Sequence, residues 1–251
     1  AILGMGQPSQ VRNGFLKGLG VAPGARFVAQ RYNAFLSGSG PGAMVANGML
    51  TIFRESALSG AVISNNSWGP TGSPQGYDVP TRQIDMIARD ALSDQAGQQP
   101  VIPIWSVMNG NGDASGACAP ASTASPDEAK NLFAVGSTNL QSSNGAQLAG
   151  LFNVSSNSAH GNACDGRRLP HIVAPGCSTE SATNTSSTAY TTMCGTSMAS
   201  PIVTGAASLF IEKYRANNEG RTPSTAMVKA AFTAVAQNLE GFRDADNRVM
   251  G

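Results

Sequence analysis

A serine at the predicted start of an apolar helix is the first residue that could do covalent chemistry. Ser197 lies in the run Gly195-Thr196-Ser197-Met198-Ala199-Ser200-Pro201, and apolar residues follow at helical spacing as far as Ile211. Free backbone N–H groups and the helix dipole would favour the negative charge that forms when this serine attacks a carbonyl carbon. Pro201 fits a first helical turn, where a missing N–H is harmless. A serine at such a position is usually only a helix cap, so position alone decides nothing.

A glycine-flanked asparagine offers a second chemical group. Residues 101–112 form an apolar run that ends in Asn109-Gly110-Asn111-Gly112. Small neighbours would let a carbonyl oxygen approach a side-chain amide, and an amide N–H aimed at a tetrahedral oxyanion stabilises the transition state more than the ground state. The alternative is that these residues form an ordinary turn.

Both segments resemble the subtilisin family of serine peptidases. The run around Ser197 agrees with the family's nucleophile motif, Gly-Thr-Ser-Met-Ala-x-Pro, at every fixed position, which implies that Ser197 is the nucleophile. The family's Gly-Asn-x-Gly segment after a strand implies that Asn111 supplies the oxyanion amide, with Asn109 as the alternative if the register shifts by two. A lipase-type elbow would need Gly-x-Ser-x-Gly, whereas Ala199 stands two positions after Ser197.

A third segment, residues 63–70, contains Ser67-Trp68-Gly69 and also resembles the family. There this strand end pairs with extended substrate and walls the pocket before the scissile bond, which implies substrate-binding roles for Ser67, Trp68, Gly69 and Gly110. The alternative is a buried strand that closes in a turn. The resemblance therefore implies a serine endopeptidase that acts on proteins or peptides. A catalytically inactive, peptide-binding domain is the alternative function.

The family's other two catalytic motifs are absent. A subtilisin-like triad runs in the order Asp, His, Ser, and residues 1–4 resemble the continuation just after the histidine motif. We expect one domain over residues 1–251, truncated at both ends, as a fragment, one part of a nicked enzyme, or a pseudopeptidase. Only His160 and His171 are present, and we expect structural roles for both. Without a base the chain should be nearly inert, and its partner would be the missing amino-terminal segment or a propeptide.

Apolar, β-branched runs alternate with helical patterns, which predicts the elements that position these residues. The alternation favours an α/β fold, and the resemblance implies a three-layer sandwich with a mainly parallel central sheet and the Ser197 helix through its middle. Strands are predicted over residues 26–32, 61–65, 101–105, 132–137 and 171–174. Helices are predicted over residues 43–58, 79–92 and 224–237, the last capped by Thr222 before Pro223, and loops over 114–127 and 178–187.

Composition argues against several classes of partner. Charged residues make up 12% of the chain and the net charge is +1, which offers no electrostatic footprint for nucleic acid or a membrane surface. No apolar run approaches the roughly 18 residues that cross a bilayer. The uncharged polar residues between apolar runs favour a secreted or periplasmic protein.

Four cysteines, Cys118, Cys164, Cys177 and Cys194, lack the spacing of zinc ligands. Four cysteines allow three pairings and spacing does not choose among them; we predict disulfides between Cys177 and Cys194 and between Cys118 and Cys164. The chemistry requires no cofactor. Members of the family often bind structural calcium, but no carboxylate cluster with ligand spacing is evident, so no metal-binding residue is assigned.

Overall fold

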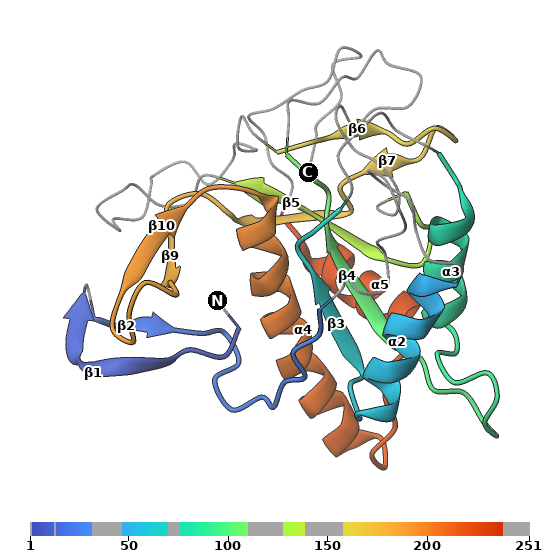
Figure 1. Ribbon diagram of the computed structural model, residues 1–251, viewed down its shortest axis with the longest axis horizontal. Coiled ribbons are helices and arrows are strands. Elements are labelled where there is room, and N and C mark those ends of the chain that lie inside the picture. Colours follow the sequence, from blue (N-terminus) through green and yellow to red (C-terminus); the bar gives the residue numbers. More distant parts are fainter. Residues whose placement is uncertain are drawn as a thin grey trace.

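A parallel β-sheet forms the centre of the protein (Figure 1). The computed structural model describes residues 2–12, 14–31, 47–69, 76–109, 128–138 and 158–237. Within these residues the sheet has four strands in the order β3-β4-β5-β8, and each neighbouring pair is parallel. The strands are β3 (Ile63–Asn66), β4 (Ile102–Ser106), β5 (Phe133–Thr138) and β8 (Ile172–Pro175). Because all run the same way, their carboxyl ends meet along one edge of the sheet.

Helices cover both faces of this sheet. Side chains alternate between the faces of a strand, so in and beside β4 Val101 and Trp105 pack with the helices on one side and Ile102 and Ile104 with those on the other. The first layer holds α2 (Gly48–Leu58) and α3 (Val79–Ile87), and the second holds α4 (Thr196–Asn217) and α5 (Thr225–Val235). Of these, α4 contacts all four strands. The predicted three-layer sandwich is therefore confirmed, with the Ser197 helix across the middle of the sheet.

Three small antiparallel pairs surround the sheet. They are β1 (Met5–Arg12) with β2 (Phe15–Leu19), β6 (Gly161–Asn162) with β7 (Arg168–Leu169), and β9 (Thr179–Ala182) with β10 (Tyr190–Met193). The first and last lie side by side beyond α4 (Figure 1). Lys17 joins them, because its Nζ lies 3.1 Å from Glu180 Oε1 and 4.8 Å from the centroid of the Tyr190 ring.

Two predicted elements are wrong. The strand predicted over residues 26–32 is absent from its described part, residues 26–31, where Phe27 is 72% and Val28 47% exposed. A β-branched, apolar pattern forms a strand only beside a partner, and no described strand pairs with this segment. The loop predicted over residues 178–187 instead begins with β9, whose polar residues pair with β10. Residues 43–46 of the first predicted helix and the predicted loop 114–127 lie outside the described residues.

Helix bounds differ from the prediction where local hydrogen bonds end or start a helix. Helix α3 ends at Ile87 rather than at residue 92, because Asp90 Oδ1 accepts from Leu92 N and Gln99 N in the turn that follows. Helix α5 is capped by Ser224, whose hydroxyl accepts from Met227 N at 3.2 Å. The predicted cap Thr222 instead accepts from the Arg215 guanidinium. None of the helices in the described part of the chain is long and apolar enough to span a bilayer.

Candidate active site

The start of α4 is fastened to the carboxyl end of β8. Gly195, the residue before the helix, donates its N–H to Gly176 O at 2.9 Å, and a disulfide joins Cys177 to Cys194. A side chain at Gly176 would collide with the Ser137 hydroxyl and the Gly195 carbonyl oxygen, so close approach requires glycine here. The predicted Cys177–Cys194 disulfide is confirmed. The predicted partner of Cys164, Cys118, lies outside the described residues.

Ser197 is the second residue of α4 and is partly exposed. Its carbonyl oxygen accepts a hydrogen bond of 2.9 Å from Ser67 Oγ, at the carboxyl end of β3. The sequence predicted Pro201 in the first turn of this helix. It is the sixth residue of α4 and therefore lies beyond the first turn. The predicted helix after Ser197 is confirmed, although it begins one residue earlier, at Thr196; the predicted place of Pro201 in its first turn is wrong.

Asn65 ties the same strand to α4. Its Nδ2 donates to Ser67 Oγ at 3.3 Å, and its Oδ1 accepts from Ser200 Oγ at 2.9 Å and Thr204 Oγ1 at 3.1 Å. Asn65 is not among the residues predicted from the sequence. The available signal was its spacing, because residues two apart on a strand face the same side, which puts Asn65 and Ser67 together against α4.

Asn109 reaches the start of α4 from the end of β4. Its Oδ1 accepts from Thr196 N at 3.0 Å and from Thr196 Oγ1 at 3.2 Å. A backbone N–H can only donate, so this contact identifies the oxygen of the carboxamide and leaves its NH₂ group to donate elsewhere. The preceding residue, Met108, has a left-handed φ of 70° and is held by a hydrogen bond from Ala159 N to its carbonyl oxygen at 3.1 Å. Asn111 and Gly110 lie outside the described residues.

Trp68 and Gly69 continue from Ser67 along the same edge. Trp68 O accepts from Trp105 Nε1 at 2.8 Å, and the two indole rings pack edge to face with centroids 4.8 Å apart. Gly69 lies directly against the Met108 side chain, leaving no room there for a side chain of its own unless Met108 moves. Thus Ser67 contacts the start of α4 directly, whereas Trp68 packs with the core on the α2 and α3 side and Gly69 lies against Met108, the residue before Asn109.

Both histidines make structural contacts. His160 is buried, with Nδ1 2.9 Å from Ser158 O. His171 lies at the amino end of β8, away from the start of α4, and its Nδ1 accepts from Ala134 N at 2.9 Å. In the described part of the chain, neither histidine makes a hydrogen bond with Ser197.

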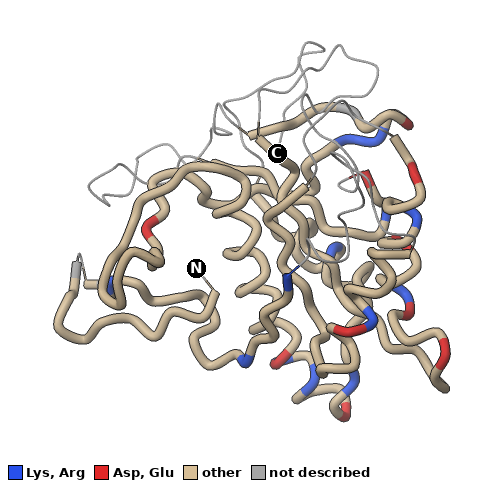
Figure 2. The backbone as a smooth tube through the Cα atoms, in the orientation of Figure 1, with Lys and Arg blue, Asp and Glu red and all other residues tan. Residues whose placement is uncertain are grey.

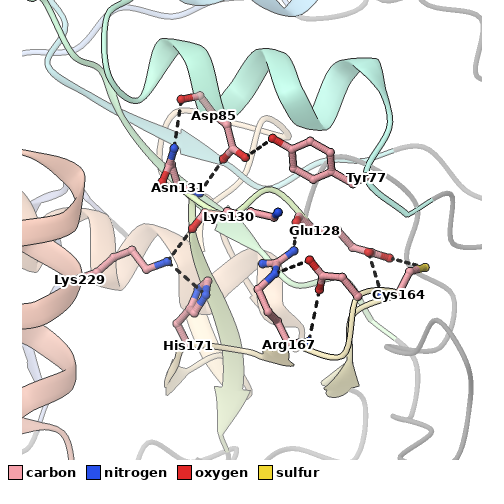
Figure 3. A network of polar contacts seen from close by, with 10 residues as sticks. Tyr77, Asp85, Glu128, Lys130, Asn131, Cys164, Arg167, His171 and Lys229 are labelled. Atoms are coloured by element: carbon pink, nitrogen blue, oxygen red, sulfur yellow. Dashed lines mark hydrogen bonds and ion pairs between the residues drawn. The ribbon is translucent and has the colours of Figure 1, made fainter.

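A network of ionisable groups surrounds His171 (Figure 3). Lys229 Nζ lies 3.2 Å from His171 Nε2 and donates to Lys130 O and Leu132 O at 3.1 and 3.0 Å. Burial and the nearby Lys229 charge lower the pKa of His171 to about 3, and burial lowers that of Lys229 to about 8.

Acidic side chains also belong to this network. Tyr77 donates its hydroxyl to Asp85, and burial with this hydrogen bond raises the tyrosine pKa to about 12. Burial raises the pKa of Glu128, which accepts from Cys164 N at 3.0 Å. No motif in the sequence predicted this network. Within the described residues, no group of three or more His, Cys, Asp or Glu side chains is placed to hold a metal ion.

Comparisons with known proteins give a family and a set of similar folds. The family model described as the subtilase family matches residues 1–251. The solved structure of prenylagaramide maturation protease PagA is 20% identical with a TM-score of 0.57, covering 89% of this chain and 68% of that one. Patellamide maturation protease PatA is 18% identical with a TM-score of 0.55, covering 82% and 63%. The PatG macrocyclase in complex with peptide is 17% identical with a TM-score of 0.61, covering 89% and 56%.

These structural similarities concern the fold. The chain spans about two thirds of PagA and PatA and 56% of PatG. No curated protein matches the sequence significantly.

Proposed function

Because the chain belongs to the subtilase family, we propose that it carries the nucleophile of a serine endopeptidase. In this proposal Ser197 Oγ attacks the carbonyl carbon of a peptide bond, a base takes its proton, and the leaving amine receives a proton. Water then releases the acyl group from Ser197. The observation that carries the proposal is the position of Ser197, partly exposed at the start of a helix whose first turn is fastened to three strand ends.

The oxyanion would be held by the backbone N–H of Ser197 and a side-chain amide. Asn109 is favoured for the amide, because Thr196 fixes its oxygen beside the proposed nucleophile and thereby orients its NH₂ group, the part of the carboxamide that can donate. Asn111, which the sequence motif favours, remains the alternative. The neutral carboxamide and the helix dipole would both stabilise charge that develops only during the reaction.

The substrate would be an extended peptide along the edge formed by Ser67, Trp68, Gly69 and Gly110. Recognition by such an edge would rest more on main chain than on side chains. PatG, which has a similar fold, was solved in complex with peptide. That similarity supports a peptide as the substrate class.

The base and its aspartate are proposed to lie outside this sequence, in an amino-terminal segment of the same protein or in a second part of a nicked enzyme. Phe27 and Val28 are exposed and β3 is an edge strand of the described sheet, which supports an additional chain packing there. A propeptide is a second candidate partner. The Cys177–Cys194 disulfide supports secretion or a periplasmic location. No cofactor is needed for this chemistry, and a structural calcium ion remains a proposal without assigned ligands.

Labelling with a fluorophosphonate tests the proposal. The full-length protein is expected to become labelled at Ser197 and to cleave a denatured protein substrate, whereas Ser197→Ala should do neither while unfolding at the same temperature. The competing function is capture of extended peptides without cleavage. A full-length protein that binds peptides but never labels at Ser197 would support that function and exclude the peptidase.

A further inference from the structure

The carbonyl oxygen of Ser197 lacks its ordinary partner in α4. In an α-helix the carbonyl of residue i accepts from the N–H of residue i+4, which for Ser197 is residue 201. That residue is Pro201, which has no N–H to donate. The helix therefore cannot supply the hydrogen bond that would hold the carbonyl group of the proposed nucleophile.

Ser67 supplies this hydrogen bond from another element. Its hydroxyl donates to Ser197 O at 2.9 Å, although the two residues are 130 positions apart in the sequence. The hydroxyl proton can serve only one good acceptor. Asn65 Nδ2 donates to the oxygen of the same hydroxyl at 3.3 Å, which leaves the Ser67 proton directed at Ser197 O.

The chain of hydrogen bonds is closed by α4 itself. Ser200 Oγ donates to Asn65 Oδ1 at 2.9 Å, Asn65 donates to Ser67, and Ser67 donates to Ser197 O. Each link uses one donor and one acceptor in a consistent direction, an arrangement in which neighbouring hydrogen bonds strengthen one another. The end of β3 thus holds α4 at two points, the carbonyl oxygen of Ser197 and the hydroxyl of Ser200.

We infer that Ser67 is a positioning residue that replaces the hydrogen bond removed by Pro201 and so fixes Ser197 relative to Asn109. This inference rests on the proposed function and gives Ser67 a role distinct from contact with substrate. The carbonyl carbon is bonded to the Ser197 Cα, so release of the carbonyl lets the hydroxyl and the backbone N–H move together. Small displacements of reacting groups cost large factors in rate.

A double-mutant cycle between Ser67 and Pro201 tests the inference in the full-length protein. Ser67→Ala is expected to lower kcat, and the rate constant of fluorophosphonate labelling, by about 10-fold with KM within about twofold. Pro201→Ala restores an N–H at residue 201, and its kcat and labelling rate constant should stay within about threefold of those of the original protein. When Ser67→Ala is added to the Pro201→Ala variant, the loss should shrink to about threefold or less, because the helix then holds the carbonyl itself.

Ser208 provides a matched control on the same helix. Its hydroxyl donates to Thr204 O at 2.8 Å, a carbonyl that also has the ordinary helical donor, the N–H of Ser208. Ser208→Ala should therefore leave kcat and labelling within about twofold. A substrate-contact role for Ser67 would change KM and would not depend on the residue at position 201.

Thermal unfolding gives a readout that does not need activity. Ser67→Ala should lower Tm by about 2–4 °C in the original protein and by about 1 °C in the Pro201→Ala variant. Equal losses in both backgrounds, in rate and in Tm, would overturn the inference. If the original protein never labels at Ser197, the proposed peptidase function is wrong. The Tm measurements then decide about the hydrogen bond separately: equal losses in both backgrounds would show that Ser67 does not replace the missing N–H, and a smaller loss in the Pro201→Ala variant would show that it does so without a role in catalysis.

Discussion

The two ends of the parallel sheet hold their side chains with different chemistry. At the carboxyl end, the start of α4 is fixed by neutral groups, namely the amides of Asn65 and Asn109, the hydroxyl of Ser67 and the backbone of Gly176. At the amino end, buried and half-buried ionisable groups form a network of polar contacts, among them His171 and Lys229 (Figure 3). In Figure 2 most of the segments coloured as charged lie on the side of α2 and α3 and at the far end of α4, and none is drawn at the start of α4.

Under the proposed function, this contrast separates charge that would develop during the reaction from charge that the fold carries permanently. Neutral dipoles that are already oriented can stabilise a transient oxyanion without ionisable neighbours that titrate. Buried ionisable groups instead make the free energy of unfolding depend on pH. Changes at the carboxyl end should therefore alter rate, and changes at the amino end should alter the pH dependence of stability.

The largest effect is expected at Asn109. Asn109→Ala in the full-length protein should lower kcat by about 100- to 1000-fold, because it removes the amide that would hold the oxyanion. The kcat of Asn111→Ala should stay within about threefold of that of the original protein. Steady-state kinetics on one peptide substrate compares them, and the opposite ranking would return the oxyanion role to Asn111.

Gly176 should show the next largest effect. Gly176→Ala places a methyl group against the Gly195 carbonyl and the Ser137 hydroxyl, and overpacking of this kind costs about 1–3 kcal/mol. Labelling at Ser197 should slow as well, because Gly195 leads into α4. Gly24→Ala is the control, since nothing lies within 4 Å of its added carbon. Chemical denaturation that finds the two variants equally stable would show that β8 does not clamp the helix.

Acidification should reveal His171. Its pKa is lowered to about 3 in the folded state, against an ordinary value of about 6.5, so the unfolded state binds more protons between these values and stability falls as pH falls through that window. From pH 7 to pH 5 the free energy of unfolding of the original protein should fall by about 1–2 kcal/mol more than that of His171→Asn. The amide oxygen of the introduced asparagine can still accept from Ala134 N. Parallel losses measured by urea denaturation would contradict a buried, neutral His171.

Lys229 should act in the alkaline range with a smaller effect. Its pKa of about 8 lies below the ordinary value of about 10.4, so the unfolded state binds more protons between these values and stability rises with pH there. Between pH 7.5 and 9.5 the free energy of unfolding of the original protein should rise by about 1 kcal/mol relative to that of Lys229→Met. Stopping at pH 9.5 avoids Tyr77, whose raised pKa of about 12 would act in the opposite direction above pH 10. If the free energy of unfolding changed with pH equally in both proteins, the Lys229 ammonium group would have to be solvated in the folded state.

Local sequence patterns predicted the central strands and the helix that contains Ser197, because those segments are apolar with clear periodicity and pack against one another. They failed at residues 26–31, where the pattern of a strand is present but no described partner strand is. They also failed at β9, whose polar residues resemble a loop until β10 pairs with them. In both cases strand formation depends on a neighbour that a local pattern does not contain.

The sequence by itself determined which side chains could do the chemistry, since the motifs around Ser197 and Ser67 specify residue types at fixed spacing. Only the tertiary structure decided how they are held: that Asn109 faces Thr196, 87 residues away, and that Ser67 takes the place of the N–H missing at Pro201. The physical reason is that these hydrogen bonds join the ends of strands to a helix far along the chain. Their partners are chosen by the packing of the layers, which no local pattern encodes.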